Sequence, residues 1–273
     1  MQLSSNCLFH FTKSFKNIKT ILEQEAFIPS YCKEKNWLSN SENIYVPQVS
    51  FCDIPLSNTS KIESYGDYAL GLSMSWGEKN KLNPVSYLNN NSVVFERFTT
   101  LSKTPDSYGD LAKRKKMLLN MSGIVPARSM EDYFAKIPTD VLEIIKNSIT
   151  NFQQYTKEYS GTLDRSGKKP KLNYKFYDEK EWRFTPPPSH QFLDFFNQSL
   201  WETEGKEIFK QKPHFKNLPN SWLRFDKNDI EYIILKNSND IDELIKYFTK
   251  NKSANKDLLL TKVLDFEKLK RDI

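Results

Sequence analysis

The segment Tyr174–Phe184 constrains the fold most, because its charges come together on one face only if it forms a strand. Its aromatic content is typical of a β-strand, and alternate residues of a strand share a face. Glu179, Glu181 and Arg183 would therefore project to one side. Two carboxylates and a guanidinium form either a solvated face, in which the arginine balances the acids, or a buried functional cluster. The charge pattern alone favours the solvated face.

The size and composition of the chain allow one large domain or two small ones with a true core. It has 273 residues, of which 38% are hydrophobic and 14% aromatic, and this excludes wholesale disorder. No apolar run approaches the roughly 20 residues needed to cross a bilayer. Residues 1–7 have neither the basic start nor the apolar stretch of a signal peptide. We therefore expect a cytoplasmic protein without a membrane partner.

The cysteines and histidines predict neither a disulfide framework nor a metal site. Cys7, Cys32 and Cys52 are odd in number and far apart, which is typical of reduced, structural cysteines. None of the three histidines has a neighbour at metal-ligand spacing. The sequence also lacks a Walker-type loop and a G-x-G-x-x-G loop.

Positive charge gathers in residues 160–175, which we call the basic segment. The formal net charge is +6, and this segment follows a smaller cluster at residues 113–116. Ser, Gly and Pro indicate a loop over Ser160–Pro170. Cations there would attract polyanions, phosphates above all, although a charge run is more often a solvated surface loop. The cations of the segment are Arg165, Lys168, Lys169, Lys171 and Lys175.

The hydrophobic pattern predicts an α+β arrangement of strands, a helical insertion and further strands, rather than alternating parallel units. We expect one domain over residues 1–273, with a largely helical insertion at about 90–160 that buries Phe152. Ser14 is the expected N-cap of a helix over roughly residues 15–25. The other expected elements are strands at 7–12, 45–55, 68–73, 84–88, 229–235 and 261–264, and helices at about 192–200 and 241–248, the latter capped by Asn239 or Asp240.

Several short motifs resemble known families. Leu8-Phe-His-Phe-Thr12, followed by a helix with Asn17-Ile18-x-x-Ile21-Leu22, resembles the opening of ADP-ribosyltransferases of the DarT-like and RNA 2′-phosphotransferase-like branch. The stretches Val49–Pro55 and Tyr65–Ser73 and the Glu-x-Glu-Trp-Arg segment are similar to the AbiGi-type abortive phage-resistance family. Each motif is short, so their order along one chain carries more weight than any one of them, and fold analogy does not fix function.

The resemblance implies an ADP-ribosyltransferase-like split β-sandwich that binds NAD, as co-substrate, between two sheets. Breaking the nicotinamide–ribose bond builds positive charge on the ribose, as in glycoside hydrolysis. Glu181 matches the family's glutamate, and Glu179 would activate the nucleophile, although either could be the catalytic glutamate. His10 would bind a ribose hydroxyl; without the resemblance it is a core histidine. The other implied cofactor contacts are Phe11, Thr12, Ser50 and Phe51, with Tyr65 or Tyr68 stacking on the nicotinamide ring.

Together with the basic segment, the resemblance implies a mono-ADP-ribosyltransferase toxin that acts in bacterial anti-phage defence, with a cognate antitoxin protein as partner. The expected acceptor is nucleic acid, RNA rather than DNA. The basic segment would select the acceptor, and Tyr174 and Phe176 would stack a splayed base. The alternative is a catalytically inactive antitoxin or binding partner of an abortive-infection system that kept the fold. Hydrolysis of NAD without an acceptor is a third hypothesis. The expected nucleic-acid contacts are Arg165, Lys168, Lys169 and Lys171.

Overall fold

The computed structural model describes residues 5–35, 43–58, 65–99, 148, 151–163, 169–187, 196–197, 201–205, 214–250 and 256–272. Most of the insertion expected at 90–160 lies outside these residues, as do Arg165 and Lys168. The chain forms two compact units. The first unit consists of Met1–Glu34, Asn43–Val85 and Lys175–Ile273, and the second of Lys35–Glu42 and Ser86–Tyr174.

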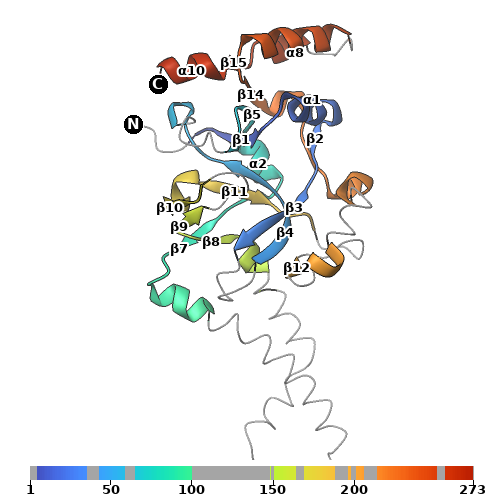
Figure 1. The fold of residues 1–273 in the computed structure, drawn as a ribbon. Helices are drawn as coiled ribbons and strands as arrows, with labels where there is room; N and C mark the ends of the chain where they lie inside the picture. The colour runs from blue at the N-terminus through green and yellow to red at the C-terminus, as the bar shows by residue number, and fades with distance from the viewer. Residues whose placement is uncertain are drawn as a thin grey trace, which may run out of the picture. The chain divides into compact units, whose positions relative to one another are not determined.

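One sheet organises the first unit, with its strands in the order β15-β14-β5-β1-β4-β11-β6 (Figure 1). The pairs β1–β4, β1–β5, β4–β11 and β5–β14 are antiparallel, and β14–β15 is parallel. Two further strands, β3 and β12, pair with β4. The bounds are β1 (Cys7–Thr12), β3 (Ser30–Lys35), β4 (Asn43–Cys52), β5 (Tyr68–Ser73), β6 (Asn83–Pro84), β11 (Glu181–Phe184), β12 (Phe196–Asn197), β14 (Ile230–Leu235) and β15 (Val263–Asp265).

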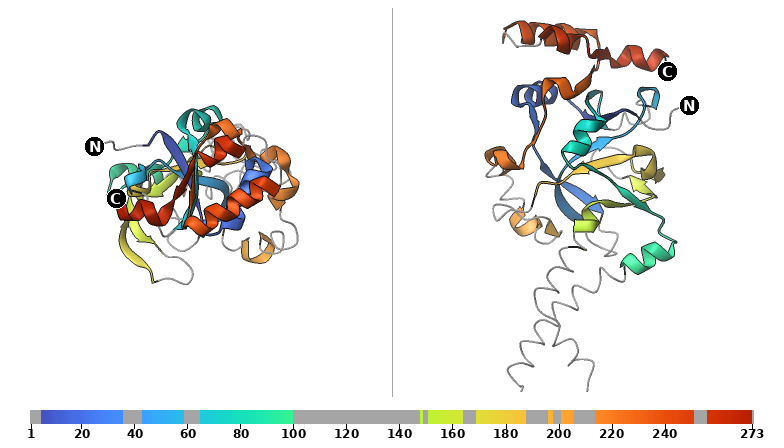
Figure 2. Two further views of the ribbon diagram at one scale, coloured as in Figure 1. Left: turned by 90° about the horizontal axis from the view of Figure 1, so that it is seen from above. Right: turned by 180° about the vertical axis from the view of Figure 1, so that it is seen from behind.

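Helices lie beside this sheet, so the expected α+β class is confirmed at this level. Helices α8 and α10 accompany the β14–β15 edge (Figure 2). Among the described residues, no helix is both long and apolar enough to cross a membrane. The helical bounds are α1 (Phe15–Gln24), α2 (Met74–Lys79), α8 (Ser238–Lys250), α9 (Lys256–Leu260), α10 (Phe266–Asp272), the 3₁₀ helices η2 (Phe176–Glu179), η4 (His214–Asn217), η5 (Pro219–Ser221) and η6 (Lys227–Asp229), and the π-helical turn η3 (Trp201–Gly205).

Helix α1 begins and packs as its sequence predicts. The Ser14 hydroxyl accepts a hydrogen bond from the backbone N–H of Asn17, at 3.3 Å, and so satisfies one of the free donors of the first turn. Phe15, Ile18 and Leu22 recur at helical spacing and are buried. The expected N-cap and the expected apolar face are both confirmed.

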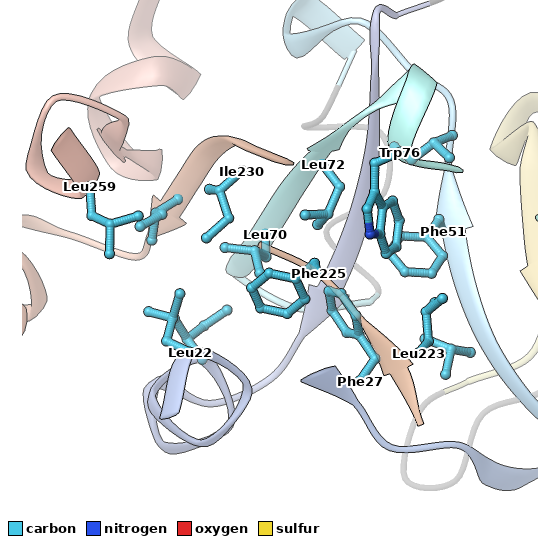
Figure 3. Packing of buried hydrophobic residues seen from close by; sticks show 14 of the residues in the cluster. Leu22, Phe27, Phe51, Leu70, Leu72, Trp76, Leu223, Phe225, Ile230 and Leu259 are labelled. Atoms are coloured by element: carbon cyan, nitrogen blue, oxygen red, sulfur yellow. The ribbon is translucent and has the colours of Figure 1, made fainter. Parts of the chain in front are cut away.

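The core of the first unit is rich in aromatic side chains. Phe27 lies at its centre, on β2 (Ala26–Phe27), which pairs with β13 (Leu223–Arg224). The Phe27 ring centroid is 5.1 Å from that of Phe51, 5.3 Å from that of Phe225 and 6.1 Å from that of Trp76 (Figure 3). Since buried aromatics of this size contribute much of a core's stability, these contacts fix β2 and α2 against the central strands.

The expected continuous strand Tyr174–Phe184 is wrong. The chain forms β10 (Lys171–Lys175), then the 3₁₀ helix η2, and resumes as a strand only at β11. Lys180, which joins η2 to β11, has left-handed backbone angles, φ 43° and ψ 53°. Because a left-handed residue interrupts the alternation of an extended strand, Glu179 does not share a strand face with Glu181 and Arg183.

Other expected elements also differ from the structure. The sequence predicts a helix at 192–200, but Phe196–Asn197 form strand β12. The cap of α8 is neither Asn239 nor Asp240, because the Asn237 side chain accepts from the backbone N–H groups of both, at 3.1 and 3.4 Å. The strand expected at 84–88 is divided into β6 and β7 (Ser86–Leu88).

In the second unit, β7 runs parallel to β8 (Thr156–Glu158), and β9 (Ser160–Leu163) pairs with β10. Residues Ser160–Leu163, expected in a loop, are therefore a strand. Phe152 is exposed rather than buried. The buried Glu158 carboxylate is held by Lys35, with 2.6 Å between Nζ and Oε1.

Candidate functional site

The central strands of the first unit present two different faces around the candidate residues. Cys52 of β4 lies opposite both Phe9 of β1 and Glu181 of β11. Residues directly opposite in antiparallel strands project to the same side, and their sequence neighbours to the other. Glu181 therefore projects with Cys52, whereas His10 projects with Phe51. The charged face carries Gln48, Ser50, Cys52, Glu181 and Arg183, and the aromatic face carries Leu8, His10, Phe51, Leu70 and Trp182.

A buried ion cluster occupies the charged face. The Arg183 side chain, 1% exposed, donates from Nε to Glu181 Oε1 at 2.8 Å and from Nη2 to Glu181 Oε2 at 3.0 Å. Its Nη2 also donates to Glu34 Oε1 at 3.0 Å. The side chains of Glu181 and Glu34 are 7% and 20% exposed. The interpretation of Glu181 and Arg183 as a solvated face is therefore wrong, and both oxygens of Glu181 accept from one guanidinium.

Gln48 extends this cluster toward the backbone of β4. Its side-chain amide donates to Glu34 Oε1 and to Ser50 Oγ, both at 3.1 Å. The other amide atom, Oε1, is buried without a hydrogen-bond partner among the described residues. The orientation of the amide follows from Glu34, because a carboxylate only accepts. Glu34 is thus fixed from two sides, by Arg183 and by Gln48.

Cys32 lies on β3, beside the ion cluster. Its pKa is raised to about 11, first by burial and second by the negative charge of Glu34. Since the thiolate is the nucleophilic form, this shift disfavours reaction of the thiol at neutral pH.

His10 is a neutral histidine on the aromatic face. Its Nδ1 lies 2.9 Å from the Ser50 carbonyl oxygen, which can only accept, so Nδ1 carries the proton and Nε2 is an acceptor. The ring centroid is 5.0 Å from that of Phe27 and 5.5 Å from that of Phe51. Burial lowers the pKa of His10, and the hydrogen bond to Ser50 opposes this effect only in part. The side chain of His10 is half-buried, held to the backbone of β4 through Nδ1 and flanked by the rings of Phe27 and Phe51.

Glu179 is buried through a different contact. The Tyr65 hydroxyl donates to Glu179 Oε1, and the carboxylate-bearing residue is 1% exposed. Tyr65 packs in a small apolar cluster with Phe11, Cys52 and Ile54. Cys52 belongs to the charged face, so Tyr65 and Glu179 lie on that side of the sheet.

Tyr68 and Thr12 lie on the aromatic side instead. They are opposite one another in the β1–β5 ladder, two residues beyond the His10–Leu70 pair. The Asn17 side chain donates to Thr12 Oγ1 at 2.7 Å. The Tyr68 hydroxyl donates to Asp240 Oδ2 at 3.0 Å, and burial together with this contact raises the pKa of Tyr68 to about 12. Tyr65 and Tyr68, the two candidates for stacking on the nicotinamide ring, thus lie on opposite faces of the sheet.

The expected site residues are divided by the sheet rather than gathered in one place. Sequence reasoning missed Glu34 and Gln48, which complete the ion cluster. Nothing in the pattern marks Glu34, because it stands within three consecutive charged residues, Lys33–Lys35. No three His, Cys, Asp or Glu side chains among the described residues are placed to share a metal ion. The charged side holds Phe11, Ser50, Tyr65, Glu179 and Glu181, and the aromatic side holds His10, Thr12, Phe51 and Tyr68.

The basic segment keeps some of its expected cations at the surface. Lys169 and Lys171 are both exposed, and Lys171 begins β10. Phe176, expected to stack a base, is buried in η2 and unavailable, whereas Tyr174 is half-buried. Arg165 and Lys168 lie outside the described residues.

Comparison with known proteins gives a family match and a relative that aligns over most of the chain. The profile of the family described as "Putative abortive phage resistance protein AbiGi, antitoxin" matches residues 25–236. The "Abortive phage resistance protein AbiGi" of Lactococcus lactis subsp. cremoris is 27% identical over 272 residues, covering 90% of this chain and 99% of the relative. No solved structure matches the chain significantly.

Proposed function

The chain belongs to the abortive phage resistance AbiGi family, and from this premise we propose that it acts as a non-catalytic antitoxin that binds a partner protein. The family description contains the word antitoxin, which favours this function over an enzymatic one. The observation that carries the proposal is the placement of Glu181 and His10 on opposite faces of the sheet.

The contacts of Glu181 support a structural role. A carboxylate that stabilises a developing cation acts through charge that other groups have not already neutralised. Here the guanidinium of Arg183 contacts both carboxylate oxygens, at 2.8 and 3.0 Å. A buried pair of this kind fixes local geometry, and its separation would leave a buried charge without a partner.

The environment of His10 supports the same conclusion. Residues that bind one ligand must converge on it, and on this sheet His10 projects among Phe27 and Phe51. Glu181 projects away from these rings, with Cys52. The two residues therefore serve different sides of the central strands.

NAD-dependent ADP-ribosyl transfer, with NAD as co-substrate and RNA as acceptor, is the second candidate. The observation that favours it is the strand order, because only β4 separates the strands that carry His10 and Glu181. Two strand spacings amount to roughly 10 Å, a distance that a dinucleotide spans. This candidate requires Arg183 to release Glu181 when NAD binds.

A growth experiment separates the two candidates. The chain is induced alone, and then together with each neighbouring gene of its native locus. The proposal predicts normal growth with the chain alone, and relief of growth arrest caused by one neighbouring gene. A folded Glu181→Gln variant, checked by its melting temperature, should relieve that arrest equally. Growth arrest by the chain alone, lost in Glu181→Gln, would reject the proposal in favour of the transferase.

A further inference from the structure

Strands β9 and β10 form a two-stranded sheet of their own, drawn in yellow in Figure 1. We call residues 160–163 and 169–175 the cationic ribbon. It contains Lys169, Lys171 and Lys175, all exposed, and none of its residues is acidic. Glu158, which precedes β9, is buried against Lys35 and does not offset this charge.

A large apolar side chain stands among these lysines. Leu172 is 75% exposed, the highest value for a large hydrophobic residue in the part of the chain that the structure describes. The next residue, Asn173, has a φ of 53°, a left-handed conformation that asparagine tolerates better than most residues. An exposed leucine on an ordered strand, with lysines on either side, has the layout of an apolar contact surrounded by a polar rim, as at protein interfaces.

We infer that the cationic ribbon is the docking element for an acidic partner protein, with Leu172 entering an apolar pocket and the lysines contacting surrounding carboxylates. This inference rests on the proposed function, because it assigns the surface through which the antitoxin binds its toxin. The chemistry favours protein over nucleic acid. Sequence-tolerant binding of single strands relies on exposed aromatic rings that stack on bases. The one aromatic residue of the ribbon, Tyr174, is half-buried, and the large hydrophobic side chain that the ribbon exposes is the leucine.

Binding between purified proteins tests the inference. The probe is the product of the neighbouring gene whose toxicity the chain relieves, titrated against the full chain. Leu172→Asp should weaken binding at least about tenfold, as the loss of a central anchor does. The combined Lys169→Glu, Lys171→Glu and Lys175→Glu variant should weaken it by about tenfold or more, with a reduced dependence on salt.

Two control variants separate the ribbon from general effects. Val93→Asp introduces the same charge at another exposed apolar residue of the second unit, 61% exposed. Lys16→Glu, Lys246→Glu and Lys250→Glu together change three exposed lysines on α1 and α8 and match the ribbon variant in net charge. Both controls should bind within about twofold of the wild type, as surface substitutions away from an interface do.

Three outcomes would overturn the inference and leave the proposed function standing. Ribbon variants that melt and bind like the wild type would remove the docking role while leaving the antitoxin function intact. If the matched lysine control weakened toxin binding equally, the loss of binding would come from the change in net charge and not from the ribbon. The ribbon would be assigned to nucleic acid if the wild-type chain bound RNA or DNA and the lysine variant lost that binding but still bound the toxin like the wild type. Failure of the wild-type chain itself to bind the toxin would instead reject the proposed function, and the inference with it.

Discussion

Arg183 contacts both carboxylate oxygens of Glu181, two residues earlier on the same strand, through Nε at 2.8 Å and Nη2 at 3.0 Å. The same Nη2 reaches Glu34, on β3, at 3.0 Å. One buried guanidinium thus joins β3 to β11. The residue that most resembles a catalytic glutamate is, in this structure, part of a link between two strands.

Replacement of Arg183 by methionine should destabilise the protein strongly. The change leaves the carboxylates of Glu181 and Glu34 without their shared cation in a buried setting. Breaking a buried ion pair in this way costs about 3–5 kcal/mol, which urea unfolding measures as a lower midpoint at unchanged slope.

The double variant Glu181→Leu, Arg183→Met is the matched control for this change. It removes the buried carboxylate together with the guanidinium, so it should be more stable than Arg183→Met alone. If the loss of stability in the double variant equalled the sum of the losses in Glu181→Leu and Arg183→Met alone, the two residues would not be a coupled pair.

Tyr65→Phe should destabilise the protein by about 1–3 kcal/mol, because it removes a hydroxyl donor from the buried Glu179 carboxylate. Thermal unfolding at pH 7 measures the loss. Tyr232→Phe, at a half-buried tyrosine of β14 whose ring stacks on Phe9, provides the comparison and should stay within about 0.5 kcal/mol of the wild type. Equal effects of the two changes would argue against the Tyr65–Glu179 bond.

The stability of the protein should fall as pH decreases through about 6.5, the usual pKa of histidine, because of His10. Burial lowers the pKa of His10 in the folded state, so the unfolded chain binds a proton that the folded chain does not. By linkage, acidification in this window favours unfolding. Melting temperatures between pH 7.5 and 5 follow the effect, and a folded His10→Gln variant should show a shallower decrease. The same slope in both proteins would assign the pH dependence to other groups.

Local patterns predicted the elements that depend on local physics. The helix at 15–25 follows from Ser14 and from the spacing of Phe15, Ile18 and Leu22, and β14 follows from the apolar run Ile230–Leu235. Each of these signals lies within a few residues of the element that it predicts, and tertiary contacts then reinforce it.

The arrangement of the site depended on features without a local signal. The break before β11 occurs at Lys180, a residue type that does not announce a positive φ as glycine would. The partner that holds Arg183 from β3, Glu34, is 149 positions away in the chain. The pairing register of the strands decided which face each candidate residue occupies, because a shift of one residue transfers every side chain of a strand to the other face.

The release of nicotinamide from NAD by the purified chain tests the central claim, that Glu181 is a structural and not a catalytic carboxylate. The wild-type protein and Glu181→Gln are incubated with NAD, with and without cellular RNA, and nicotinamide is quantified by chromatography. Our account predicts no release above the buffer blank for either protein. Release by the wild type that disappears in Glu181→Gln, while the variant keeps its circular dichroism and melting temperature, would contradict it.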